Sequence, residues 1–597
     1  MRWLGSISLP LRKFSVRLTR TPRQTPRLLQ RIVGSDAGPW ALIDVIWRTI
    51  FISLQYDRWL KRNALTATDI TELRGLLSDL SYQPLISILM PVYNTDERWL
   101  CQALDSVQQQ IYPHWELCVA DDASTAPHVT AIIQQYQQTD SRIKLVRRPA
   151  QGHIAAASNS ALELATGEYV ALLDHDDVIA ADALLEVARL LNRHPEADMI
   201  YSDEDKLDSN GHRIEPFFKP DWSPLLLFNI NYITHFAVLR RQLVIDVEGF
   251  RHAYVGSQDH DLFLRVTAQT DRVFHIPKVL YSWRKAATSA ALSADNKSYA
   301  QNASFRAVED AIALRDGYAT VTPGNYAPFI RVRYPVMGDP LVSLVVLVRD
   351  EKELAAAQAM IDRTDGRRCE LIVVTRQAHL RRLQPSGSLH IVISKSGSRR
   401  ALLQAGARAA SGGYLLFADH PLRPVDPDWL TALLEYAQLP DVGCVGAKVL
   451  SKRHAVMAAG MALGIDERAE AVGVGIADVP QLIFYLNLKD AIREVSAVSA
   501  ACMMVKAATF WQLGGFDHHF SDALYDADFC LRAGAHSLHT VFMPYARVVT
   551  PATNKPSTVS PEALALFQQR WHEVIASDPF YNPHLTRRRQ DMRLRTD

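Results

Sequence analysis

The sequence predicts an α/β protein built from two tandem copies of one domain. Three pairs of similar segments recur along the chain in the same order, and each copy contains short apolar runs that end in acidic or turn residues. Such runs are typical of buried parallel strands. A chain of 597 residues is also too long for one hydrophobic core, so several domains are expected.

The internal repeat is carried by three pairs of segments. They are residues 84–89 (PLISIL) with 340–345 (PLVSLV), residues 165–175 (ATGEYVALLDH) with 410–420 (ASGGYLLFADH), and residues 259–265 (DHDLFLR) with 526–532 (DADFCLR). The order is kept and the spacing changes only slightly between the copies. We infer a duplicated domain separated by small insertions and deletions.

Each copy has the pattern of β-α-β units. In the first copy, residues 85–92, 115–120 and 169–173 are apolar runs of strand length, and a helical pattern through Leu100, Leu104 and Val107 lies between the first two. This alternation predicts a largely parallel sheet covered by helices.

The overall charge excludes a nucleic-acid-binding surface as the main feature of the chain. Lys and Arg number 65 against 64 Asp and Glu, so no strong field of one sign attracts a polyanion. Six cysteines are scattered without a C-x-x-C pair. We expect reduced thiols in a cytosolic protein rather than a disulfide framework.

The first 80 residues predict a basic arm followed by a helical extension. Eight basic residues precede Asp36, the first acid, with no apolar stretch long enough for a secretory leader. Residues 40–54 (WALIDVIWRTIFISL) are too short to span a bilayer. Residues 1–55 could contact an anionic membrane face as a peripheral anchor. The alternatives are a disordered arm with a helix packed on the first domain, or an organelle transit peptide.

Acidic side chains follow two predicted strands of the first copy. Asp121 and Asp122 follow one strand, and Asp174, Asp176 and Asp177 follow another. Open α/β sheets bind ligands at the carboxyl ends of their strands. The Asp174-x-Asp176 pair is suited to a hard divalent cation, Mn²⁺ or Mg²⁺, that also binds substrate phosphates. A solvated loop or a helix cap is the alternative interpretation.

Asp259 is the candidate general base. It follows Gly249-Phe250 and opens the amphipathic segment 259–265 together with Asp261. A positioned carboxylate can accept the proton of a hydroxyl nucleophile as a bond forms. A carboxylate at this place could equally cap the following helix.

Five successive segments resemble the motifs of family-2 glycosyltransferases. They are residues 91–94 (PVYN), 121–124 (DDAS), 152–159 (GHIAAASN), 174–177 (DHDD) and 258–261 (QDHD). Residues 201–206 (YSDEDK), 218–223 (FKPDWS) and 281–284 (YSWR) are similar to a subgroup of O-antigen and capsule assembly. The resemblance runs from about residue 56 to residue 583. It implies two tandem GT-A domains: a catalytic domain at 81–285, a helical linker at 286–336, and a second, degenerate GT-A-like domain at 337–597.

The resemblance also implies roles for single residues. Nucleotide-sugar binding falls on Pro91, Tyr93, Asn94, Asp121, Asp122 and Asp174. The divalent metal would be held by Asp174 and Asp176, and Asp259 would be the base of an inverting transfer. Many relatives place a further metal-binding histidine near Ser282, where this chain has none.

The second copy has lost part of this pattern. DHDD of the first copy becomes DHPL at residues 419–422, where Asp419 remains but a proline replaces the second acid. Asp526 and Asp528 are retained as the counterparts of Asp259 and Asp261. We expect a second domain that is non-catalytic or altered in donor binding; a second, metal-independent active site is the alternative.

The favoured function is an inverting, metal-dependent glycosyltransferase. Its partners would be a nucleotide-sugar donor and a cell-surface polysaccharide or lipid-linked oligosaccharide acceptor, at the cytoplasmic face of the cell membrane. A nucleotidyltransferase would need a Gly/Lys-rich phosphate loop, which residues 91–94 do not offer. A glycan-binding scaffold would not need the acids of the first copy, and a glycoside hydrolase would not need a nucleotide site.

Overall fold

A computed structural model describes residues 32, 35–285, 294–315, 317–382, 389–551 and 559–596. Most of the predicted basic arm (1–31, 33 and 34) lies outside the described residues. The chain forms two compact units. The first unit is Tyr56–Val332, and the second unit is Arg333–Asp597 together with the N-terminal segment to Gln55.

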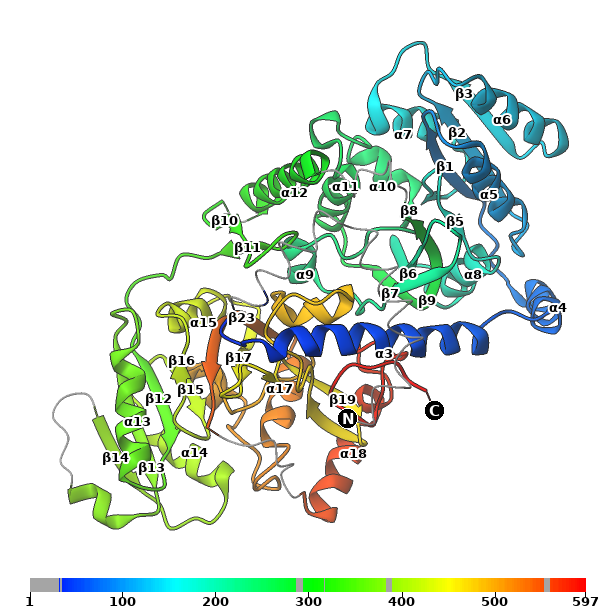
Figure 1. Ribbon diagram of the computed structural model, residues 1–597. Helices are drawn as coiled ribbons and strands as arrows, with labels where there is room; N and C mark the ends of the chain where they lie inside the picture. Colours follow the sequence, from blue (N-terminus) through cyan, green and yellow to red (C-terminus); the bar gives the residue numbers. More distant parts are fainter. Residues whose placement is uncertain are drawn as a thin grey trace, which may run out of the picture. The chain divides into compact units, whose positions relative to one another are not determined.

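The first unit is built on a nine-stranded mixed sheet in the order β3-β2-β1-β4-β8-β6-β9-β5, with β7 paired to β6 (Figure 1). Its strands are β1 (Ile86–Val92), β2 (Trp115–Asp121), β3 (Ile143–Arg147), β4 (Tyr169–Leu172), β5 (Val178–Ile179), β6 (Met199–Leu207), β7 (Arg213–Phe217), β8 (Val238–Arg240) and β9 (Val273–Arg284). Strands β1 to β4 are mutually parallel, whereas β8 runs antiparallel to both of its neighbours.

The first unit also contains nine α-helices in its described residues. They are α4 (Ala67–Gly75), α5 (Glu97–Gln108), α6 (Pro127–Thr139), α7 (His153–Leu164), α8 (Ala183–Arg193), α9 (Pro224–Asn229), α10 (Arg241–Asp246), α11 (Gln258–Thr267) and α12 (Ala294–Arg315). Helix α7 packs on β1 and β2, and α12 packs on α11. Strands β10 (Thr320–Pro323) and β11 (Ile330–Arg333) form a separate two-stranded sheet.

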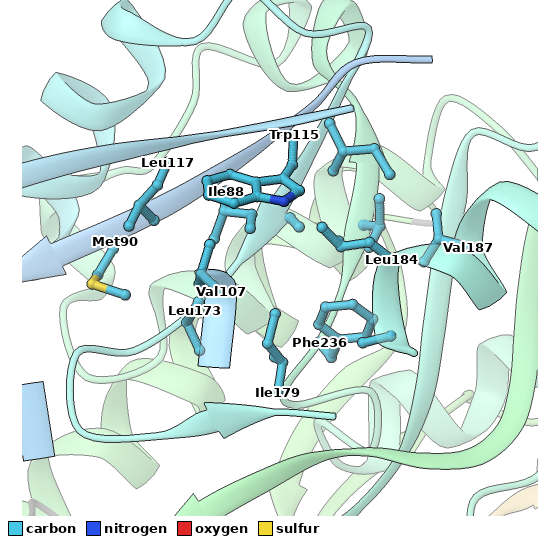
Figure 2. Close-up of a cluster of buried hydrophobic side chains, with 14 of the residues drawn as sticks. Ile88, Met90, Val107, Trp115, Leu117, Leu173, Ile179, Leu184, Val187 and Phe236 are labelled. Atoms are coloured by element: carbon cyan, nitrogen blue, oxygen red, sulfur yellow. The ribbon is translucent and has the colours of Figure 1, made fainter. Parts of the chain in front are cut away.

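The core of the first unit is formed by buried, mostly apolar strands and by the buried faces of α5, α6 and α8. Figure 2 shows Ile88, Trp115, Leu184 and Phe236 meeting from different elements. All seven residues of β1 are buried, as expected of a strand with both faces covered. Helix α5 buries Leu100, Leu104 and Val107, the helical pattern seen in the sequence.

The second unit repeats this arrangement. Its ten-stranded sheet has the order β14-β13-β12-β15-β22-β17-β23-β16, which matches the first sheet strand for strand. Strand β18 pairs with β17 as β7 pairs with β6, and β21 is added at β23. The strands are β12 (Val342–Leu347), β13 (Cys369–Thr375), β14 (Leu389–Ile393), β15 (Tyr414–Ala418), β16 (Arg423–Pro424), β17 (Val442–Leu450), β18 (Val456–Ala458), β21 (Arg493–Glu494), β22 (Met503–Lys506) and β23 (His539–Val549). The predicted tandem α/β architecture is confirmed.

Further elements complete the second unit. Its helices are α13 (Glu351–Asp362), α14 (Arg399–Ala409), α15 (Trp429–Ala437), α16 (Ala507–Gln512), α17 (Tyr525–Ala535) and α18 (Pro561–Ala576). A two-stranded sheet of β19 (Met461–Ile465) and β20 (Arg468–Ala471) packs against α18.

Two of the repeated sequence segments are hydrogen-bonded to each other in both units. In the first, Ser87 donates to Glu116 (2.6 Å) and accepts from the backbone N–H of Gly167 (2.8 Å). In the second, Ser343 makes the same bonds to Glu370 (2.5 Å) and Gly412 (2.9 Å). These buried bonds join three strands, which explains why the segments 84–89 and 165–175 recur together as 340–345 and 410–420.

Helix α3 (Trp40–Arg62) begins in the second unit. Its residues Ala41 and Val45 are buried in a small cluster with Ala477 and Val479, and the backbone N–H of Ala477 donates to Asp44 (3.0 Å). The expectation that this helix packs on the first domain was therefore wrong for residues 40–45. The partners lie more than 400 residues away along the chain, and local sequence carries no information about such contacts.

We predict that Gly412→Ala destabilises the second unit. A Cβ at this position would lie 2.6 Å from the carbonyl oxygen of Leu341 and 2.7 Å from Ser343 Oγ. Overpacking of this kind typically costs about 1–3 kcal/mol. Urea unfolding should show the loss in the free energy of unfolding. The matched control is Gly413→Ala, whose Cβ would meet nothing within 4 Å; equal losses in both variants would contradict the prediction.

Candidate active site

The carboxyl ends of β1, β2 and β4 meet at one edge of the first sheet. Val92 lies opposite Asp121, and Leu89 lies opposite Leu172. The chain therefore leaves these three strands at neighbouring points, where ligands of open α/β sheets bind. The side chains predicted to bind the nucleotide or metal lie in the last two residues of these strands or in the loops that follow them.

Asn94 ties the loop after β1 to the loop after β2. Its Oδ1 accepts hydrogen bonds from the backbone N–H groups of Thr125 (2.9 Å) and Ala126 (3.0 Å), and its own N–H donates to Ser124 Oγ (3.0 Å). The neighbouring side chain of Tyr93 remains 37% exposed. An exposed aromatic ring on a fixed loop is suited to stacking on a planar ligand group such as a base.

Asp121 and Asp122 are both buried. Asp121 accepts a hydrogen bond from Thr130 Oγ1 (2.9 Å), and Asp122 accepts from Arg148 Nε (2.9 Å) and from the N–H of Gly152 (2.9 Å). These bonds order the loops that follow β2 and β3. Direct contact of either carboxylate with a nucleotide stays a prediction.

Three possible metal ligands come together after β4. The ligand atoms of Asp174, Asp177 and His235 all lie within 4.8 Å of one another. Asp174 is partly exposed, with 40% of its side chain accessible, and its Oδ2 lies 4.0 Å from His235 Nε2. Two carboxylates with an imidazole are a donor set that Mn²⁺ accepts. The residues present therefore fit a divalent cation.

His235 is held by two neighbours behind the cluster. Its Nδ1 lies 3.2 Å from Glu204 Oε2, and its ring stacks on Tyr281 with centroids 4.8 Å apart. The Tyr281 hydroxyl donates to Asp177 (2.6 Å), which orients that carboxylate. Burial lowers the pKa of His235, but the charge of Glu204 outweighs this effect and the pKa reaches about 9. Without a ligand, the ring is an imidazolium at neutral pH.

Asp176, the second predicted metal ligand, lies beside this cluster. Burial raises the pKa of its carboxyl group, and the charge of Asp174 raises it further. Its backbone carbonyl accepts a hydrogen bond from Arg284 Nε (2.6 Å), which fixes the turn that carries it. Coordination by Asp174 and Asp176 stays a prediction, to which the structure adds Asp177 and His235.

A small pocket of about 60 Å³ joins the candidate metal and base residues. Its lining includes Pro91, Asp174, His235 and Asp259, from four separate segments of the first unit. The backbone carbonyl of Pro91 lies 3.0 Å from His175 Nδ1, so the loop after β4 is anchored to β1. The predicted cation ligand and the predicted base thus face one space.

Asp259 lies in the first turn of α11. The N-cap residue of this helix is Ser257, so Asp259 is not the cap that the alternative interpretation required. Asn231 Nδ2 donates to Asp259 Oδ2 (2.8 Å), and burial raises the pKa of the carboxyl group. A raised pKa makes the ionised carboxylate a stronger proton acceptor.

Asp261 has a structural role. Its side chain is 1% exposed and forms ion pairs with Arg251 and, at 2.7 Å, with Arg265. Arg265 also donates to the carbonyl oxygen of Gly249 (2.7 Å). Asp261 therefore fastens α11 to the Gly-Phe turn that precedes it, which separates its function from that of Asp259.

The comparison with protein families identifies this part of the chain. Residues 87–247, from β1 through α10, match the family described as "Glycosyl transferase family 2". The first unit therefore contains a segment that is similar to family-2 glycosyltransferases. The match contains the strand-end acids, Glu204 and His235, and ends before Asp259.

Two relatives resemble nearly the whole chain. "Uncharacterized protein y4gI" of Sinorhizobium fredii is 35% identical over 562 residues, which cover 89% of this chain and 61% of that protein. "O-antigen biosynthesis protein RfbC" of Myxococcus xanthus is 33% identical over 540 residues, covering 88% of this chain and 42% of that protein. The chain therefore spans less than two thirds of either relative. A solved structure of S. aureus TarS residues 1–349 with UDP is 20% identical, with a TM-score of 0.33 over 39% of this chain and 66% of that one.

Strand register shows which residues of the second unit stand where the first unit has its candidate site. Val178 of β5 faces Ser282, and Arg423 of β16 faces Val549, so these pairs are equivalent. One residue earlier, Asp177 corresponds to Leu422 and Tyr281 to Val548. Glu204, which faces Tyr281, corresponds to Val449, which faces Val548.

The histidine of the cluster is also replaced. Ala171 faces Val238 in the first unit, and Leu416 faces Met504 in the second. Counting back three residues from Val238 and from Met504 aligns His235 with Ala501. The second unit thus carries apolar residues at four positions of the polar cluster, in addition to the proline at 421.

The retained acids of the second unit have different surroundings. Asp528 accepts from Arg532 (2.8 Å) and from Arg570 (2.6 Å), repeating the structural role of Asp261. Asp526 accepts from the backbone N–H of Ala500 (2.9 Å). Asp419 lies 3.3 Å from the guanidinium of Arg399.

Sequence reasoning missed His235, Glu204 and Tyr281 as members of the site. Glu204 and Tyr281 lay in segments noted only for resemblance, and His235 lay in none of the motifs. Their relation depends on β6 and β9 being paired and on the loop before β8 crossing over them. A histidine three residues before a short strand carries no recognisable pattern.

We predict that Tyr281→Phe weakens Mn²⁺ binding without unfolding the first unit. The variant keeps the ring stacked on His235 but loses the hydroxyl that orients Asp177. Loss of such a supporting hydrogen bond typically lowers metal affinity about 10–100-fold. Titration of the full chain with Mn²⁺, followed by electron paramagnetic resonance, measures the change.

Tyr112→Phe is the matched control for this variant. Its buried hydroxyl donates to the carbonyl oxygen of Pro84 (2.8 Å), away from the cluster. Both variants should lose similar stability, but only Tyr281→Phe should bind Mn²⁺ less tightly. An unchanged Mn²⁺ affinity in Tyr281→Phe would show that Asp177 is not a ligand of the metal.

Proposed function

We propose that the chain is an inverting glycosyltransferase that moves a sugar from a nucleoside-diphosphate donor to a polysaccharide or lipid-linked oligosaccharide. The observation that supports this proposal is the shared pocket of Asp174, His235 and Asp259. It brings a cation-binding set and a candidate base within one space. The family-2 domain and the O-antigen name of one relative point to the same class of reaction.

The residues in and around the pocket would have separate roles in binding the nucleotide and the metal. Tyr93 and the loops held by Asp121 and Asp122 would receive the nucleotide. Asp174 and Asp176, with Asp177 and His235, would hold the divalent metal, which neutralises the charge of a diphosphate leaving group. These groups lie at the carboxyl edge of the sheet, where a donor diphosphate can approach them.

Asp259 would act on the acceptor. Its carboxylate faces the pocket with Asn231 as its side-chain donor, whereas Asp261 is held by two arginines. Asp259 would take the proton of the attacking hydroxyl while that oxygen displaces the diphosphate from the anomeric carbon. A single displacement inverts the configuration at that carbon.

A direct experiment tests this proposal. The full chain is incubated with a panel of nucleotide sugars, Mn²⁺ and lipid-linked oligosaccharides, and nucleoside diphosphate and the product anomer are measured. Release of nucleoside diphosphate with inversion is expected, and EDTA should abolish it. Release of pyrophosphate would instead identify a nucleotidyltransferase, and retention of configuration would exclude Asp259 as the base of a single displacement.

We predict that Asp259→Asn lowers turnover about 10²–10⁴-fold, the usual contribution of general base catalysis. Asparagine keeps the size of the side chain but does not accept the proton, so donor affinity should change little. Measuring kcat and donor Kd checks both points. Asp261→Asn should mainly lower the free energy of unfolding, because it breaks buried ion pairs with Arg251 and Arg265. Normal turnover of Asp259→Asn would show that another group is the base.

We also propose that the exposed face of α3 rests on an anionic membrane at the cytoplasmic side. Ile43, Trp47, Phe51 and Leu54 lie at helical spacing and are 59%, 57%, 39% and 44% exposed. The opposite face buries Ala41, Val45 and Ile52. Within the described residues, no helix has the length and apolarity to cross a bilayer. An apolar stripe after eight basic residues is suited to peripheral contact with acidic lipids.

We predict that Trp47→Asp reduces binding to vesicles of phosphatidylglycerol and phosphatidylcholine by about tenfold or more, since burial of such a side chain is worth roughly 1.5–3 kcal/mol. Co-sedimentation at low and high salt measures the effect. Trp511→Asp is the control, because Trp511 is also exposed (41%) but lies on α16. Equal losses in both variants, or no loss in either, would contradict a role for α3.

A further inference from the structure

The second unit contains a pocket of about 250 Å³ at the place where the first unit has its candidate active site. Asp419 and Asp526, the counterparts of Asp174 and Asp259, both line it. Ala501, which stands at the position of His235, also lines it. Replacement of an imidazole by a methyl group leaves room there, so the loss of the polar cluster has opened the site.

The pocket has a wall that the first unit lacks. Between β6 and β8 the first unit has β7 and α9, whereas between β17 and β22 the second unit has β18, the β19–β20 sheet and β21. Met461, Arg468 and Glu470 of that small sheet line the pocket. Glu470 forms an ion pair with Arg468 (2.5 Å) and accepts a hydrogen bond from Gln590. An added and anchored wall indicates a site shaped for a ligand rather than a remnant.

The pocket contains two ion pairs, and its remaining acids, Asp522 and Asp526, accept hydrogen bonds from the backbone N–H groups of Arg399 and Ala500. Arg399 lies 3.3 Å from Asp419, and Arg468 lies 2.5 Å from Glu470. His420 Nδ1 lies 3.1 Å from the other Asp419 oxygen. The lining therefore offers many hydrogen-bond donors and acceptors without an excess of positive charge for a diphosphate. Among the described residues, the groups of three or more possible metal ligands do not include Asp419 or Asp526.

Apolar side chains complete the lining. Met457, Met461, Leu524 and Val559 stand beside the polar groups. A mixture of apolar surface with fixed polar groups of both kinds is what a sugar ring requires, because it presents hydroxyl groups at its edge and C–H groups on its faces. The volume lies just below the range of about 300–1,000 Å³ typical of pockets for drug-sized ligands, so it is suited to about one sugar unit.

We propose that this pocket binds a neutral saccharide without a metal ion, as a holding site for the glycan on which the first unit acts. Saccharide binding as such is independent of the proposed glycosyl transfer, whereas the identity of the ligand as the acceptor glycan rests on it. Binding of one unit of a long acceptor here would raise the effective concentration of the chain near the protein. The second unit would then contribute to acceptor affinity instead of a second transfer.

The first test measures binding alone. Saturation-transfer NMR on the full chain in EDTA uses glucose, galactose, mannose, rhamnose and N-acetylglucosamine and their short oligosaccharides as probes. Ala501→Phe, which fills the pocket, should weaken binding about tenfold or more. Ala535→Phe, the same change on the exposed end of α17, should leave it unchanged.

Several results would overturn the proposal. They are no saccharide binding in EDTA, and equal binding by Ala501→Phe and wild type. If Ala501→Phe does not fold, as judged by its melting temperature, the isosteric Asp419→Asn variant replaces it and should also bind less tightly. Mn²⁺-dependent binding of a nucleotide sugar that Ala501→Phe abolishes and Asp176→Ala retains would identify a donor site instead.

A second test addresses the acceptor. If the first unit transfers sugar, Ala501→Phe should raise KM for long acceptors about tenfold while kcat and the KM for short acceptors stay unchanged. Equal effects on short and long acceptors would overturn the holding site. Failure to detect any transfer would contradict the proposed function, but the binding test in EDTA would still decide whether the pocket takes a saccharide.

Discussion

The arrangement of the candidate active site depends on one buried negative charge, the carboxylate of Glu204. Glu204 lies inside the sheet on β6, and burial alone would raise its pKa, but the ammonium of Lys219 and the ring of His235 outweigh this effect and lower it. Lys219 is itself fully buried, and Thr234 is bonded to the same carboxylate. These bonds fix the loop before β8, and with it the ring that faces Asp174 and Asp177.

The side chains of such a network are tolerated as apolar residues when all of them change together, but not when one changes alone. Removing one partner of a buried ion pair leaves an uncompensated charge, which typically costs about 3–5 kcal/mol, whereas an apolar set of similar volume is often tolerated. The second unit shows this outcome, since Val449, Ala501, Val548 and Leu422 stand at the positions of the cluster. The carboxylate that holds the helix after the Gly-Phe turn, Asp528, is kept, because it stabilises the fold in both units.

The two units therefore share a framework and differ in the edge that binds ligands. Ser87 and Ser343 make equivalent hydrogen bonds in the two units, and the sheets have the same strand order. In the first unit the edge gathers carboxylates and an imidazole around a narrow pocket. In the second unit, the pocket at the same edge is larger, contains two ion pairs and is lined in part by the β19–β20 sheet. These features favour a neutral ligand over a metal-bound diphosphate.

The sequence by itself determined the duplication, the α/β class, the strand-end positions of Asp121 and Asp174, and the place of Asp259 at the start of an amphipathic segment. These depend on local periodicity and on the rule that loops at the carboxyl ends of parallel strands share one edge. The predicted domain boundaries stay predictions. Only the tertiary structure decided that His235 and Asp177 join Asp174, that Asp261 is structural, and that the start of α3 packs on the second unit. His235 and the start of α3 meet partners that are far apart in the chain, and such contacts are set by the packing of the whole unit rather than by any local pattern. Asp261 is paired with Arg251 and Arg265 nearby in the chain, but spacing alone does not show which of Asp259 and Asp261 faces the pocket.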